Sequence, residues 1–177
     1  MAAALLSAQL ANRDTAVQVS SAGILGAGQL GAGQPPPPAV IDVLAARGLD
    51  VAWHHSRVVT PGDLARADLI LGMSREHVRH AAVLLPQAWP RAFTLRELAR
   101  RGQEAGPRGP AEPLSGWLAR VAPCRDRREL LGSSPGDDVA DPLGGTRDGY
   151  EATARLLAEL THELADLCWP YDPGVPH

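Results

Sequence analysis

The 177-residue sequence contains no lysine, so each of its 17 cationic residues is an arginine. Twenty acidic residues leave a formal net charge of −3. This balance offers no basic surplus of the kind that predicts nucleic acid or an anionic membrane as a partner. No apolar run approaches the roughly 20 residues that a membrane-spanning helix needs. We therefore expect a cytoplasmic protein with neither a nucleic-acid nor a membrane partner.

Cysteine and aromatic residues are also scarce. The two cysteines, Cys124 and Cys168, are too few for a disulfide framework in a chain of this length. Aromatic residues make up 4% of the chain, so the core must consist mainly of Leu, Val and Ala. The apolar fraction of 45% and the charged fraction of 21% are ordinary for a globular protein. We expect a free loop thiol at Cys124 and a packed thiol at Cys168.

Short apolar runs alternate with amphipathic segments along the chain. Strands are predicted at Val17–Ser20, at Asp68–Met73 and, more weakly, at Pro90–Leu95. Such alternation predicts an α/β fold, a parallel sheet flanked by helices. The predicted helices are Met1–Ala11, Ala39–Arg47, Ser74–Leu85, Leu95–Arg101, Leu114–Val121 and Asp148–Leu167.

The composition predicts a single domain over residues 1–168. Residues 102–136 are rich in Gly, Pro and Arg and are predicted to form a mobile insertion. Residues 169–177 are predicted to be a frayed tail. The run GAGQLG at 26–31 matches a dinucleotide-binding pattern, but the prolines that follow would interrupt the helix which that pattern needs. We interpret it as a linker.

The Asp141-Pro142 pair, followed by two glycines, predicts a rigid turn that presents one carboxylate. A general acid needs such a placement, held close to the oxygen that leaves. The same residues also fit a purely structural turn ahead of the last helix, with Thr146 or Asp148 as its cap. From these residues alone the structural interpretation is favoured.

Histidines suggest a metal site at first sight. Four of them, His54, His55, His77 and His80, lie within a short part of the chain. Zinc needs three or four converging ligands, and no third helical ligand follows His77 and His80. We expect ordinary surface histidines, with neither a metal nor a cofactor.

Six motifs follow one another along the chain: SSAG at 20–23, a G-x-P segment leading into a helix at 33–47, GLDVAWHHSRVVT at 48–60, DLARADLILGMSREH at 63–77, FTLRELAR at 93–100 and DVADPLGG at 138–145. In this order and spacing they resemble the low-molecular-weight protein tyrosine phosphatases, especially bacterial members with a long insertion before the Asp-Pro motif. The resemblance implies a four-stranded parallel sheet between layers of helices. It also implies hydrolysis of phosphotyrosine through a cysteinyl-phosphate, on a protein substrate, with a bacterial tyrosine kinase as a possible partner and no cofactor.

The resemblance also implies roles for individual residues. Asp141 matches the family's general acid by its place in the Asp-Pro motif. His54 matches a histidine that supports the phosphate-binding loop from behind. Leu143 stands where the family usually has Tyr or Phe, so the aromatic wall over the substrate ring is absent at that position.

The largest departure from the family concerns the nucleophile. The family's first strand runs into a C-x5-R-S-P loop, but the residues six positions after Cys124 and Cys168 are Leu130 and Gly174. The opening MAAALLSAQL resembles the helix that follows that loop. We expect the sequence as given to lack the loop and the first, central strand, and to be inactive. The missing front would lie upstream of a misassigned start, or the chain would be a truncated relative.

Two further functions remain open. One is a non-catalytic phosphatase-like binding module that competes for phosphorylated partners. The other, ranked lower, is an arsenate reductase on the same fold, which would need additional thiols close to the nucleophile.

Overall fold

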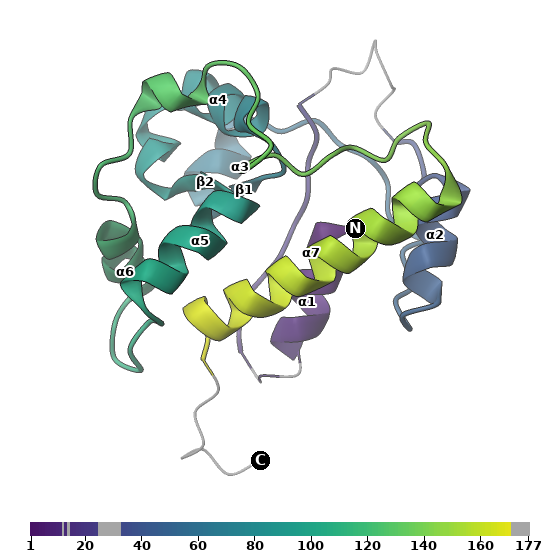
Figure 1. The fold of residues 1–177 in the computed structure, drawn as a ribbon, viewed down its shortest axis with the longest axis horizontal. Helices are drawn as coiled ribbons and strands as arrows, with labels where there is room; N and C mark the ends of the chain where they lie inside the picture. Colours follow the sequence, from purple (N-terminus) through teal and green to yellow (C-terminus); the bar gives the residue numbers. More distant parts are fainter. Residues whose placement is uncertain (12, 14, 25–32, 171–177) are drawn as a thin grey trace. The chain divides into compact units, whose positions relative to one another are not determined.

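The computed structural model describes residues 1–11, 13, 15–24 and 33–170. They divide into two compact units, whose elements are drawn in Figure 1. The first unit comprises Met1–Thr60 and Ala140–Thr161, and the second comprises Pro61–Val139 with the residues from His162 onward. The GAGQLG motif at 26–31 and residues 171–177 of the predicted tail lie outside the described residues.

The second unit contains the sheet of the protein. Two parallel strands, β1 (Ile70–Gly72) and β2 (Ala92–Thr94), pair with Leu71 opposite Phe93. The helix α4 (Arg75–Leu84) supplies the crossover that parallel strands require. Both strands fall inside segments predicted from the sequence, and the predicted α/β class, a parallel sheet flanked by helices, is confirmed. Among the described residues the sheet has two strands, whereas the resemblance implies four.

Close packing fixes the turn between β1 and α4. A Cβ atom at Gly72 would lie 2.9 Å from both the His77 Cβ and the Val78 Cγ2 atom. Only glycine lets the helix approach the end of the strand this closely. Besides α4, the helices of this unit are α3 (Pro61–Arg66), η1 (Pro86–Arg91), α5 (Leu95–Ala105), α6 (Leu114–Val121) and η2 (Arg127–Leu130). Figure 1 shows α3, α4 and α5 close to β1 and β2, with α6 on the far side of α5.

The segment 102–136 contributes to the core of this unit. Its helix α6 has the predicted bounds and buries Trp117 completely. A Cβ at Gly102 would lie 2.9 Å from Leu167 Cδ1 and 3.1 Å from the Trp117 ring, so the glycine leaves room for that ring. Part of the predicted insertion is therefore helical and packed, whereas its mobility remains a prediction.

The first unit is helical. It contains α1 (Ala2–Ala11), α2 (Pro38–Ala45) and the first part of α7 (Arg147–Cys168), each close to its predicted range. A core cluster joins α2 and α7 through Val43 and the buried Tyr150.

The strand predicted at Val17–Ser20 is wrong, because these residues belong to no strand. Among the described residues of this unit, the only strand-like pairing is a single parallel bridge between Gly23 and Val58. β-Branched residues favour extended backbone, but a strand forms only where a neighbouring chain pairs with it. No helix in the described part of the chain is long and apolar enough to cross a membrane.

Candidate active site

The turn at Asp141 is closed by its own backbone. The N–H of Leu143 donates to Asp141 Oδ1 at 3.0 Å, and the N–H of Gly145 donates to Pro142 O at 2.8 Å. Gly144 has φ of 76°, a conformation that glycine adopts without strain. The Asp141 side chain is exposed, so the turn presents a carboxylate to solvent as its sequence predicts.

Thr146 then starts α7. Its Oγ1 accepts the N–H of Gly149 at 3.3 Å, and its carbonyl accepts the N–H of Tyr150 at 3.2 Å. These bonds satisfy amide donors that the first turn of a helix leaves free. The structural interpretation of the turn, with Thr146 as cap, is therefore confirmed. It is compatible with an acid at Asp141, which remains a prediction.

His54, the second predicted site residue, lies in a turn of the same unit. Its backbone N–H donates to Val51 O at 3.0 Å, and its half-buried ring meets the Trp53 ring edge-on at 6.2 Å between centroids. Trp53 is 72% exposed. The hydrogen bonds described for His54 and Asp141 stay within their own turns, and the supporting role of His54 remains a prediction.

Just before the Asp-Pro motif, the chain is anchored to the turn between β1 and α4. The N–H of Val139 donates to Met73 O at 2.7 Å. Asp138 Oδ1 accepts the N–H of Arg75 at 2.7 Å, and its Oδ2 accepts the N–H of Ser134 at 2.8 Å. Asp138 thus binds an amide of the first turn of α4, a position where a negative charge also interacts favourably with the helix dipole. Sequence reasoning missed this anchor, because its partners are about 60 residues apart.

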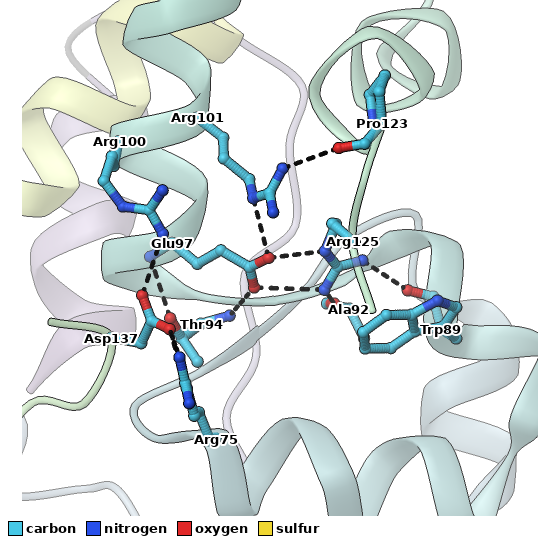
Figure 2. Close-up of polar contacts among 10 residues, drawn as sticks. All are labelled: Arg75, Trp89, Ala92, Thr94, Glu97, Arg100, Arg101, Pro123, Arg125 and Asp137. Atoms are coloured by element: carbon cyan, nitrogen blue, oxygen red, sulfur yellow. Dashed lines mark hydrogen bonds and ion pairs between the residues drawn. The ribbon is translucent and has the colours of Figure 1, made fainter. Parts of the chain in front are cut away.

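Asp137 strengthens the same anchor and is drawn in Figure 2. Its Oδ2 accepts Arg75 Nε at 2.9 Å and Arg75 Nη2 at 2.7 Å, and its Oδ1 accepts Arg100 Nη2 at 3.2 Å. Burial would by itself raise the pKa of Asp137, but the hydrogen bonds and charges of the two arginines outweigh it. The net pKa lies below its usual value, so the group stays ionised.

Glu97 is the centre of a second, more buried cluster, shown in Figure 2. Its Oε1 accepts Arg125 Nε at 2.7 Å and lies 3.2 Å from Arg101 Nε. Its Oε2 accepts the N–H of Thr94 at 3.4 Å, while Thr94 Oγ1 accepts the N–H of Glu97 at 3.0 Å. This capping box begins α5, the helix predicted from Leu95.

Arg125 is packed as well as paired. Its guanidinium lies 4.0 Å from the Trp89 ring centroid and 3.8 Å from the Phe93 centroid, and its side chain is 3% exposed. Stacking on aromatic faces and a carboxylate partner both suit a planar guanidinium. This contact fastens the segment after α6 to β2 and α5.

Neither thiol is placed as a phosphatase nucleophile. Cys168 is buried, which raises its pKa to about 12, with a smaller opposing effect from the charge of Arg108. Cys124 is exposed in a loop. The predictions of a packed thiol and a free loop thiol are confirmed.

The histidines do not assemble a metal centre in the described part of the chain, where no three His, Cys, Asp or Glu side chains converge as ligands. His77 Nδ1 accepts the N–H of Met73 at 3.1 Å. This ring therefore supports the turn after β1.

Comparison with known proteins identifies the family. The sequence model of the low molecular weight phosphotyrosine protein phosphatases matches residues 1–115. The chain belongs to this family. No curated protein matches the sequence significantly.

Solved structures show the same fold as this family member. YwlE arginine phosphatase from Geobacillus stearothermophilus has 23% identity and a TM-score of 0.64, covering 93% of this chain and 80% of its own. Vibrio vulnificus Wzb in complex with benzylphosphonate has 21% identity and a TM-score of 0.65, covering 93% and 86%. A low molecular weight protein tyrosine phosphatase from T. tengcongensis has 22% identity and a TM-score of 0.66, covering 93% and 87%. The predicted family and fold class are thus both confirmed.

Proposed function

We propose that this chain is the acid-bearing part of a phosphotyrosine phosphatase and that the sequence as given does not hydrolyse phosphate esters by itself. One observation supports both halves of the proposal. A member of this family presents the Asp141 carboxylate on a rigid turn, yet has no Cys-x5-Arg sequence anywhere among its 177 residues.

The proposed chemistry has two steps once a nucleophile loop is present. A cysteine thiolate forms a bond to phosphorus while the bond from phosphorus to the phenolic oxygen breaks, and Asp141 gives its proton to the departing phenolate. Water then attacks the phosphocysteine, the S–P bond breaks, and Asp141 takes the proton of that water. Asp141 Oδ1 is held by the N–H of Leu143, so Oδ2 is the oxygen suited to carry the transferred proton.

The exposure of β1 supports a place for a further strand. A parallel strand is normally buried on both faces, but Ile70 and Leu71 are only half-buried, as is Leu69 just before the strand. One edge of β1 pairs with β2, and no described residue pairs with its other edge, which could therefore receive the strand that leads into the loop. We infer that such a strand, with C-x5-R-S-P at its end, would complete the sheet and the site.

The decisive measurement is aryl phosphate hydrolysis by two forms of the protein. The purified chain as given should show only the uncatalysed rate, unchanged by Cys124→Ser or Cys168→Ser. A form extended at Met1 by a strand and a C-x5-R-S-P loop should turn the substrate over. Activity of the unextended chain that Cys124→Ser or Cys168→Ser removes would contradict the proposal.

In the extended form, Asp141→Asn should lower kcat by about 10² to 10³, as expected for loss of a general acid. Asp148→Asn is the matched control, because Asp148 is an exposed aspartate in the first turn of α7. It should leave kcat unchanged. An equal loss in both variants would argue against an acid role for Asp141.

The proposed substrate is a phosphotyrosine protein, with a tyrosine kinase as the opposing enzyme and the cytoplasm as the location. Leu143, which is 54% exposed beside Asp141, offers an aliphatic wall in place of a ring. Since similar folds include an arginine phosphatase as well as tyrosine phosphatases, the extended form should be assayed with phosphotyrosine and phosphoarginine peptides. A kcat/KM that favours phosphotyrosine supports the proposed substrate, and the reverse order contradicts it.

A further inference from the structure

The residues at 134–139 form a loop that one aspartate closes. Asp138 Oδ2 accepts the N–H of Ser134 at 2.8 Å. The Ser134 carbonyl in turn accepts the N–H groups of Asp137 and Asp138 at 3.0 Å and 2.7 Å. An aspartate side chain closes turns in this way because it is short and reaches amides a few residues away. The course of the chain through this loop therefore depends on the Asp138 carboxylate.

The same carboxylate fastens the loop to the turn after β1. Its Oδ1 accepts the N–H of Arg75 at 2.7 Å, and the neighbouring Val139 donates its N–H to Met73 O at 2.7 Å. This turn has a support of its own, because the N–H of Met73 donates to His77 Nδ1 at 3.1 Å. Both bonds of the loop thus end on backbone that is held in place at the carboxyl end of β1.

Asp137, the preceding residue, makes contacts of a different kind. It pairs with the guanidinium groups of Arg75 and Arg100, which belong to long side chains. An arginine can follow a shifted carboxylate by changing its rotamers. Asp138 instead binds two main-chain amides, and such bonds define where the backbone runs. Of the two aspartates, Asp138 is therefore the one that determines the course of the chain.

The connection from this anchor to Asp141 is short. Consecutive Cα atoms are 3.80 Å apart, so the Cα of Asp141 lies no more than about 7.6 Å from that of Val139. Pro142 has a fixed φ and disfavours helical backbone at Asp141 before it. Ala140 is thus the one residue of this connection with ordinary backbone freedom. The anchor at Asp138 therefore limits the positions that Asp141 can take.

A general acid is sensitive to such limits. Its oxygen must come within about 2.6–3.2 Å of the oxygen that leaves, and a misplacement of about 1 Å can cost about 10²-fold in rate. The bond from Leu143 holds the Asp141 carboxylate to its own turn, so a second contact must place the turn itself. A strand that pairs in parallel with β1 ends at the same edge of the sheet, where the loop at 134–139 is fastened.

We propose that Asp138 is a positioning residue for the general acid. By binding the amides of Arg75 and Ser134, it fixes the point from which the chain enters the Asp141 turn. It thereby keeps the Asp141 carboxyl within reach of the phenolic oxygen that leaves. Asp138 exchanges no proton with the substrate, because both of its oxygens are occupied by main-chain amides. The inference rests on the proposed function, in which Asp141 is the acid.

The first test uses the chain as given and needs no catalysis. Asp138→Ala should lower the heteronuclear NOE of the Ala140 and Asp141 amides, because their segment loses its anchor. Hydrogen exchange of the Arg75 and Ser134 amides should become about fivefold faster, the change expected when an aspartate cap is lost. NMR measures both quantities. An unchanged NOE at Ala140 and Asp141 would overturn the proposal.

Asp126→Ala is the matched control for this measurement. Asp126 Oδ1 likewise accepts a main-chain amide, that of Arg128 at 2.9 Å, and it caps η2 in the same unit. Its loss should leave the NOE of Ala140 and Asp141 unchanged, because the Asp138 anchor is intact. If Asp126→Ala lowers these values as much as Asp138→Ala does, the whole unit is loosened and the proposal is overturned.

The second test uses the extended form and two aryl phosphates. Phenolate is more basic than p-nitrophenolate, so its departure depends more on a proton from an acid. Asp138→Ala should lower kcat/KM about tenfold for phenyl phosphate and less than about threefold for p-nitrophenyl phosphate. Asp138→Asn retains one acceptor oxygen and should lose about threefold with phenyl phosphate, which keeps the comparison available if Asp138→Ala does not fold. Asp126→Ala should change neither value.

A double variant separates positioning from a merely structural effect. If Asp138 acts through Asp141, Asp138→Ala should cause no further loss for phenyl phosphate once Asp141→Asn is present, because the effects of coupled residues do not add. Losses that multiply, or an equal loss for both substrates in Asp138→Ala alone, would overturn the proposal and leave the proposed function intact. An extended form that is inactive, or that Asp141→Asn does not impair, would contradict the proposed function and this inference with it.

Discussion

Asp141 and Glu97 are both carboxylates at the start of structured segments, but their surroundings differ sharply. Asp141 is exposed, and the hydrogen bond described for it comes from Leu143, two residues away. Glu97 is buried and is paired with Arg125, 28 residues away. The first arrangement leaves a carboxylate available for chemistry. The second uses a carboxylate to hold distant segments together, so the two groups should respond very differently to substitution.

The largest expected effect is on packing. Trp117→Ala should lower the free energy of unfolding by about 3–5 kcal/mol, because a fully buried indole leaves a cavity. Trp53→Ala, at the exposed ring beside His54, should change it by less than about 0.5 kcal/mol. Urea denaturation of both variants measures the contrast. If both variants lost a similar free energy of unfolding, the segment at 102–136 would not contribute more to packing than the exposed turn at Trp53.

Glu97→Ala should be the next most damaging change. It leaves Arg125, which is 3% exposed, without its carboxylate partner, and breaking a buried ion pair costs about 3 kcal/mol. Asp141→Ala should cost less than about 0.5 kcal/mol, since it removes an exposed side chain. The midpoint of chemical denaturation reports both. If Asp141→Ala proves as destabilising as Glu97→Ala, then the Asp141 turn is also a structural element.

Asp137 should make stability depend on pH. Because its folded-state pKa is depressed, its contribution is complete above the ordinary pKa of about 4 and is lost as the pH falls toward the folded value. Asp137→Asn should therefore reduce stability by about 1 kcal/mol at pH 7. The gap between wild type and variant should shrink steadily below about pH 4. A gap that is constant from pH 7 to pH 3, measured by urea denaturation, would contradict this assignment.

The smallest effect concerns the two thiols and involves no change in stability. At pH 8 a thiol with a pKa of about 12 is ionised to only about one part in 10⁴, and Cys168 is also buried. An alkylating reagent should therefore modify the exposed Cys124 at least about 100-fold faster than Cys168. Mass spectrometry over time measures the two rates. The difference should disappear in urea, and its persistence there would mean that burial is not its cause.

Local signals in the sequence were sufficient for most elements. The helical pattern from Leu95 to Arg101 predicts α5, and the Asp141-Pro142-Leu143-Gly144 run predicts the turn that the structure contains. These features depend on bonds between residues two to four positions apart, so the sequence carries them directly. The strand predicted at Val17–Ser20 is wrong for the opposite reason. A strand requires a neighbouring chain to pair with, and the residues of the segment do not specify that neighbour.

The ionic clusters could not be predicted from local patterns. Arg125 lies 28 residues after Glu97, and Asp137 lies 62 residues after Arg75. The composition of residues 102–136, rich in arginine, predicts a mobile insertion, because no neighbouring residue shows which carboxylates its arginines will pair with.

The sequence by itself determined the family, the helices, the turn at Asp141 and the absence of a Cys-x5-Arg loop, because each of these is written in neighbouring residues or in their order. Only the tertiary structure decided which strands pair and which arginines meet Glu97 and Asp137. These outcomes depend on contacts between residues far apart in the chain, and such contacts form only when the hydrophobic core brings the segments together.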